Sequence, residues 1–207
     1  LREAMKSGVD YQPSTETDTR NGTSMNPLNE LVEELQAKWK LVPPETADLI
    51  LLMQEIKNRW YIAVDALTVA SSEVKNGDSL YPNVSFSFGS AFSYKRQADT
   101  IISILDEIGR IPNEEANNFC FTAIRGTLYD QGIYRGNWFL KLNQVLTNEN
   151  GAGEKLKQSV ETAIQAGREA EVLVKLFREG LEILWQQIYM GTAPEMVKKL
   201  TEGMWRG

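Results

Sequence analysis

Acidic side chains are the first candidates for chemistry in this sequence, because five of them gather between residues 30 and 48. They are Glu30, Glu33, Glu34, Glu45 and Asp48. Carboxylates alone can bind Mg²⁺ when they converge. On two helices, the same spacing also describes an ordinary solvated acidic face, which is the interpretation we favour.

A second set of candidates combines basic with aromatic side chains. Lys95 and Arg96 directly follow Phe92 and Tyr94, and further members come later: Arg125, Arg135, Asn137, Trp138 and Lys141. Aromatic rings can stack on bases while Arg and Lys pair with phosphates. The alternative is a set of core aromatics with basic residues at the rim. The hypothetical RNA site comprises Lys95, Arg96, Asp99, Arg125 and Arg135, with Asp99 orienting Arg96 from one turn away.

Several kinds of enzyme site are excluded by what the sequence lacks. There is no histidine, which removes Ser–His and Cys–His pairs and histidine metal ligands. Cys120 stands between two phenylalanines, a setting typical of a small core residue. The glycines form neither a GxGxxG nor a GxxxxGK[ST] motif. We therefore predict a protein that is not an enzyme and uses no cofactor or metal.

Composition limits the partners and the compartment. The 207 residues are 42% hydrophobic and 24% charged, which suits one domain with a proper core. The net charge of -6 argues against coating nucleic acid through bulk positive charge, but it leaves room for a local basic groove. With a single cysteine and no apolar run of about 20 residues, we expect a cytoplasmic location and no membrane partner. The chain begins at Leu1, as a fragment or processed product would, without a signal-peptide pattern.

The elements that must position these residues are predicted to be helices. Between Glu154 and Tyr189, apolar residues recur mostly every three or four positions, the period of one helix face. Similar stripes and breakers predict further helices over about 26–42, 45–75, 90–108, 112–132, 134–146 and 195–204. We predict an all-α fold: six to seven helices in a bundle, forming one domain over residues 27–207.

Two segments depart from this helical pattern. Residues 1–26 are polar and form a predicted extended arm, which either a neighbouring subunit or packing in a crystal would hold in place. Residues 81–88 alternate apolar with polar at period two, which predicts a short extended segment. Without a partner strand it is an extended connector, a two-strand ribbon with itself, or an edge offered to a neighbour. In the last case we expect self-association through Tyr81, Val84, Phe86 and Phe88.

Three resemblances suggest function. The first quarter, with Glu30, Glu33–Glu34 and then Glu45–Asp48, resembles helical MazG-type nucleotide pyrophosphatases, although its Glu-x-x-Glu-Glu order differs from their Glu-Glu-x-x-Glu. Pro82–Phe88 followed by Phe92–Arg96 resembles the middle of rod-shaped plant-virus coat proteins, where an extended segment precedes an Arg-bearing helix at the RNA groove. Residues 111–132, ending in Asp130-Gln131-Gly132, resemble a helix of flexuous filamentous coat proteins.

The coat-protein resemblances imply a subunit that assembles with copies of itself around single-stranded RNA. Our first hypothesis is therefore a non-enzymatic, self-associating coat or nucleocapsid protein, found in the virion. The second is a cytoplasmic helical adaptor or effector subunit that binds another protein. A Mg²⁺-dependent pyrophosphatase comes third.

Overall fold

The computed structural model describes residues 27–108, 110, 114–148 and 152–190, and in that part of the chain it contains five α-helices and no strand. They are α1 (Pro27–Leu41), α2 (Thr46–Glu73), α3 (Tyr81–Ile108), α4 (Glu114–Thr147) and α5 (Glu154–Met190). The all-α prediction is confirmed. The predicted N-terminal arm and the predicted helix over 195–204 lie outside the described residues.

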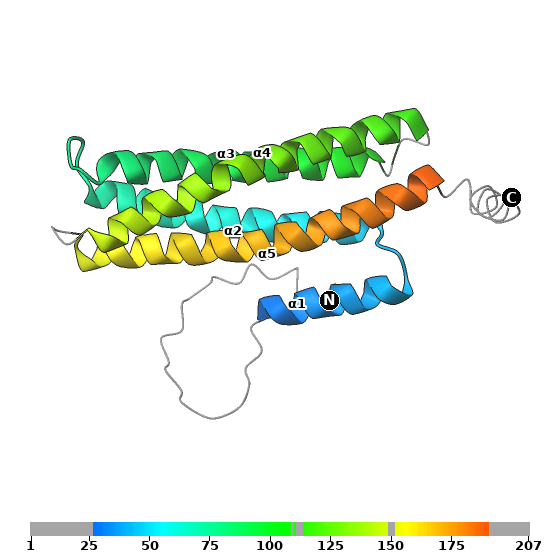
Figure 1. Cartoon of the computed structure of the whole chain (residues 1–207), viewed down its shortest axis with the longest axis horizontal. Helices are drawn as coiled ribbons and strands as arrows, with labels where there is room; N and C mark the ends of the chain where they lie inside the picture. Colours follow the sequence, from blue (N-terminus) through cyan, green and yellow to red (C-terminus); the bar gives the residue numbers. More distant parts are fainter. Residues whose placement is uncertain (1–26, 109, 111–113, 149–151, 191–207) are drawn as a thin grey trace, which may run out of the picture.

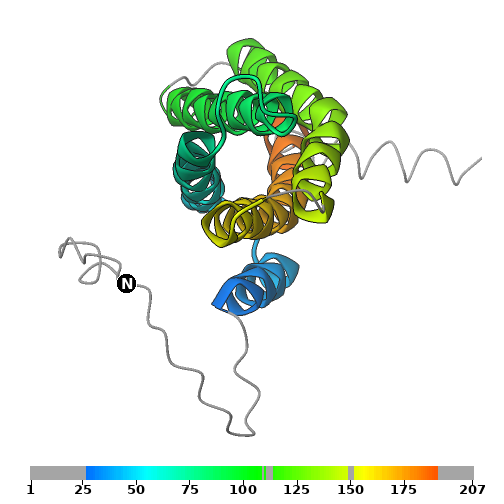
Figure 2. The same cartoon turned by 90° about the vertical axis from the view of Figure 1, so that its left-hand side faces the viewer.

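The four long helices form a ring in which each packs against the next and α5 closes on α2 (Figures 1 and 2). Between α2 and α3 the chain reverses in a tight turn, where the Asp78 carboxylate accepts a 2.8 Å hydrogen bond from the Lys75 backbone N–H. Gly77 supplies the positive φ of 106° that this turn requires. The shorter α1 lies outside the ring, beside α5 (Figure 2).

Helix α3 overturns the prediction of an extended segment over residues 81–88. Its buried positions repeat alternately every three and four residues: Val84, Ser87, Ala91, Tyr94, Ala98, Ile101, Leu105 and Ile108. Ser87 is polar but occupies a core position, whereas the apolar residues Phe86 and Phe88 lie on the flanks of the helix. The apolar residues of this segment therefore alternate with polar ones in the sequence, as they would in a strand. Ser87 is buried because its hydroxyl donates to the Asn83 backbone carbonyl, at 2.8 Å, within the helix.

Helix α4 joins two predicted helices into one, because the expected break at Gly132 does not occur. Glycine in a helix interior costs about 1 kcal/mol relative to alanine. Both halves of α4 offset this cost by burying large side chains: Phe121, Ile124 and Leu128 before Gly132, and Trp138, Leu142 and Val145 after Gly136. Tertiary packing therefore decides the length of this helix.

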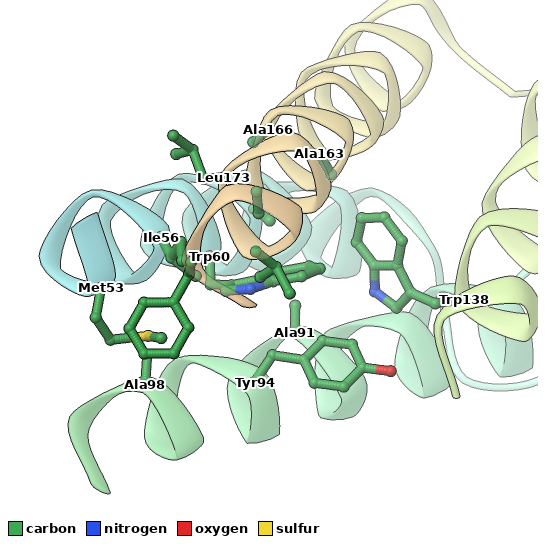
Figure 3. Packing of buried hydrophobic residues seen from close by; sticks show 14 of the residues in the cluster. Met53, Ile56, Trp60, Ala91, Tyr94, Ala98, Trp138, Ala163, Ala166 and Leu173 are labelled. Carbon is green, nitrogen blue, oxygen red and sulfur yellow. The ribbon is translucent and has the colours of Figure 1, made fainter. Parts of the chain in front are cut away.

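Aromatic rings from three helices meet in the core (Figure 3). The Trp60 ring of α2 lies 4.7 Å from Tyr94 of α3 and 5.5 Å from Trp138 of α4, the latter edge-to-face at 84°. The Trp138 indole N–H donates to the Ser87 backbone carbonyl at 2.8 Å. On the other side, a Cβ on Gly167 of α5 would come within 2.6 Å of the Trp138 ring. A glycine is thus required where α5 passes this tryptophan.

Candidate functional site

Aromatic and basic side chains share the outer surface along the α2/α3 seam. Tyr61 of α2 is 58% exposed and Phe92 of α3 is 44% exposed. The Lys95 ammonium lies 5.8 Å from the centre of the Tyr61 ring, and the Phe92 ring stacks on Phe88 with centres 6.3 Å apart. These four residues and the neighbouring Arg96 are called the α2/α3 face below.

Helical spacing explains why these residues share one surface. Phe88, Phe92 and Lys95 follow one another at intervals of four and three on α3, beside the buried stripe and on the side toward α2. Tyr61 comes from the neighbouring helix, and the sequence pattern had given no reason to include it. The turn around Gly77 returns the chain so that Tyr61 reaches Lys95.

The cations of this region differ in what holds them. Asp99 pairs with Lys57 of α2 rather than with Arg96, contrary to the expected orientation of Arg96 by Asp99. Arg96 is exposed and forms no salt bridge with another residue in the described part of the chain. Within the described residues Lys95 pairs with no carboxylate; its ammonium lies over the Tyr61 ring, which leaves its N–H groups available. Two cationic groups beside exposed rings are therefore open to an anionic partner.

Arg125 lies elsewhere, at the α4/α5 seam. Its guanidinium donates to both carboxylate oxygens of Glu182, at 2.7 and 2.5 Å, and lies 4.7 Å from the centre of the Trp185 ring. In the order of the ring this seam is opposite the α2/α3 seam (Figure 2), so Arg125 does not join Lys95 and Arg96 in one groove. The side chain of Arg135 lies outside the described residues.

The α4/α5 seam also contains a shallow cleft of about 300 Å³ that the sequence did not indicate. It is lined by Arg125, Leu128, Arg178, Leu181 and Glu182. Arg178 donates to the Leu128 backbone carbonyl at 2.7 Å. Both arginines therefore connect α4 with α5. Their partners are 57 and 50 residues away in the sequence, so no local pattern indicates these contacts.

The acidic residues near the N-terminus do not converge. Glu30, Glu33 and Glu34 are exposed on α1, whereas Asp48 is buried at the start of α2. The Asp48 carboxylate accepts hydrogen bonds from Lys38 Nζ at 2.6 Å, the Glu45 backbone N–H at 3.1 Å and Trp39 Nε1 at 3.4 Å. Among the described residues no group of three His, Cys, Asp or Glu side chains could hold a metal ion.

Opposing effects set the pKa of Asp48. Burial by itself raises the pKa of this carboxyl, but the hydrogen bonds from Lys38 and Glu45 and the charge of Lys38 hold it below its ordinary value. The same hydrogen bond raises the pKa of Lys38. Asp48 is therefore an ionised structural group that joins α1 to α2.

The four residues expected to mediate self-association have different environments. Val84 is fully buried in the core, which corrects its assignment to a contact surface, and Tyr81 is partly buried against that core. Phe86 is 38% exposed at the α3/α4 seam, where the Lys141 ammonium lies 5.2 Å from its ring centre. Phe88 belongs to the α2/α3 face. Helix formation separates these side chains because it replaces a period of two by 3.6.

Comparison with known proteins adds no relative to this picture: no protein-family model and no curated protein matches the sequence. In the part of the chain that the structure describes, no helix is both long and apolar enough to cross a bilayer.

Proposed function

We propose that this chain is a non-enzymatic, self-associating helical protein that binds single-stranded RNA along its α2/α3 face, as a coat or nucleocapsid subunit does. The observation that carries the proposal is the exposure of Tyr61 and Phe92 next to Lys95 and Arg96. Such a subunit would work in the cytoplasm or within a virion.

The chemistry of the α2/α3 face fits a single strand better than a duplex. Unpaired bases can stack on exposed rings, and each such stack contributes about 1–3 kcal/mol with little dependence on sequence. Lys95 and Arg96 can meet the phosphates of the same strand, whereas the net charge of -6 disfavours nucleic-acid contact over most of the surface. The face supplies both kinds of contact within two adjacent helices.

Stacking can be tested by removing one ring at a time. With a fluorescein-labelled oligouridylate in about 50 mM salt, Phe92→Ala and Tyr61→Ala should each weaken binding by roughly 5- to 150-fold, as the loss of one stacked base predicts. Fluorescence anisotropy measures the affinity, and circular dichroism checks that folding is unchanged.

The matched control is Phe119→Ala, which removes a ring that is 76% exposed on α4 and outside this face. It should bind RNA as the parent does. Equal binding by all three variants, or no binding by the parent, would refute the RNA site. A parent that binds no RNA but forms a discrete complex with another protein would favour the adaptor function.

Assembly needs a separate measurement. Negative-stain microscopy and size-exclusion chromatography of the chain, with and without RNA, should show rods, rings or filaments. A protein that stays monomeric under both conditions would contradict the self-associating function, whatever its affinity for RNA.

A further inference from the structure

Helix α1 lies outside the ring, beside α5 (Figure 2). Trp39 fills a gap at Gly180 of α5, where a Cβ would come within 2.5 Å of the indole and within 2.9 Å of Leu49. We call this gap the Gly180 notch. Asp48 adds the salt bridge to Lys38 and a hydrogen bond to the same indole. This surface therefore accepts an indole ring at Gly180 and an ammonium group at Asp48.

Docking within one chain leaves much of α1 uncovered. Only Leu28 of this helix is buried, while its other apolar residues remain partly exposed: Leu31, Val32, Leu35 and Trp39. At the end of α1, Leu41 is 87% exposed and Val42 is 53% exposed. Two adjacent apolar side chains open to water mark a surface that a partner would cover.

The link from α1 to α2 is short and stiff. Only residues 42–45 separate the two helices, and two of them are Pro43 and Pro44, whose φ angles are fixed near −65°. Short hinge loops with restricted backbone favour the exchange of a terminal element between copies. Such an exchange uses complementary surfaces that the chain already possesses.

We propose that two copies of this chain exchange α1, each helix docking in the Gly180 notch of the other copy. The two hinges then pass each other, and Leu41 and Val42 of one copy meet those of the other, which covers the apolar surface left open in a single chain. This inference rests on the proposed self-association and names the element that produces it.

Cross-linking of native residues distinguishes docking within a chain from exchange. Unlabelled and heavy-nitrogen-labelled copies are mixed in urea and refolded together, with circular dichroism to confirm recovery, and a zero-length carbodiimide then joins Lys38 to Asp48. In an exchanged dimer, about half of the Lys38–Asp48 cross-links should carry one labelled and one unlabelled peptide. The control is the 2.6 Å pair Lys155–Glu73, which joins α5 to α2 and should give only same-label cross-links.

Leu41, the last residue of α1, gives an independent test in the 207-residue chain. Leu41→Asp should raise the dimer dissociation constant at least tenfold by analytical ultracentrifugation, without changing the helix content, because Leu41 is exposed in the single chain. Leu140→Asp, at a 58% exposed position on α4, should leave dimerisation unchanged. If the parent is oligomeric, all Lys38–Asp48 cross-links carry a single label and Leu41→Asp has no effect on association, the exchange of α1 is wrong but self-association remains. A parent that is monomeric at all concentrations would overturn both.

Discussion

At the scale of single residues, two glycines of α5 control how close its neighbours come. A Cβ at Gly167 would overlap Trp138 of α4, and a Cβ at Gly180 would overlap Trp39 of α1. Each indole is held by a hydrogen bond, to the Ser87 carbonyl or to Asp48, so neither ring can move away freely. The absence of a Cβ at these two glycines therefore allows α5 to pack closely against α4 and against α1.

We expect Gly167→Ala to destabilise the fold by about 1–3 kcal/mol, because the added methyl group overpacks a core position. The comparison is Gly126→Ala and Gly89→Ala, two helical positions where a Cβ would have nothing within 4 Å. Those variants should gain about 0.5–1 kcal/mol from better helix propensity. Urea denaturation measures all three, and a stabilised Gly167→Ala would show that Trp138 adjusts at no cost.

At the scale of elements, one carboxylate joins two helices. Asp48 accepts from the Glu45 backbone N–H in a capping box at the start of α2, and it also binds Lys38 and Trp39 of α1. The start of α2 and the end of α1 therefore depend on the same group.

We predict that Asp48→Asn costs about 1 kcal/mol near neutral pH, as the loss of a capping or charge-assisted hydrogen bond does. The lowered pKa of Asp48 sets the pH dependence. Its contribution should be complete above the unfolded-state pKa of about 3.9 and should decline as the pH falls through the folded-state value. The stability difference between parent and variant, measured by urea unfolding from about pH 7 to pH 3, should therefore shrink in acid.

Lys38→Met provides the companion variant, because it keeps an apolar stem and removes the charged donor. In a double-mutant cycle with Asp48→Asn, the two losses should be less than additive. Strict additivity would show that the pair of Lys38 and Asp48 does not stabilise the chain.

At the scale of the whole molecule, the ring separates the basic residues that the sequence had grouped. Lys95 and Arg96 lie at the α2/α3 seam, whereas Arg125 is held by Glu182 and Trp185 at the opposite seam. A single bound strand along the α2/α3 face would meet the first two and not the third.

Salt dependence should reveal this separation. For single strands the slope of log Kobs against log[salt] changes by about 0.7 for each lost phosphate contact. We expect Lys95→Ala and Arg96→Ala each to make the slope shallower by that amount. Arg125→Ala should keep the parent's slope and lower the melting temperature instead, because it breaks a bidentate ion pair between α4 and α5. If all three variants keep the slope of the parent, RNA phosphates contact neither Lys95 nor Arg96.

The sequence by itself determined the helical class and most element boundaries. The apolar stripe of α5, the turn at Asn76–Gly77–Asp78 and the proline link after α1 are all local patterns, and a helix period is written in its own residues. The prediction of a core position for Cys120 holds only in part, because this side chain is partly buried against the core.

Only the tertiary structure decided the state of residues 81–88, the continuity of α4 and the membership of the candidate site. A serine occupies a core position in α3 because the helix satisfies its hydroxyl and Trp138 covers its carbonyl. Glycines persist within α4 because packing on both sides outweighs their propensity. Lys95 lies over the Tyr61 ring, and Asp99 pairs with Lys57 instead of Arg96. Both contacts join different helices, so no local sequence pattern encodes them.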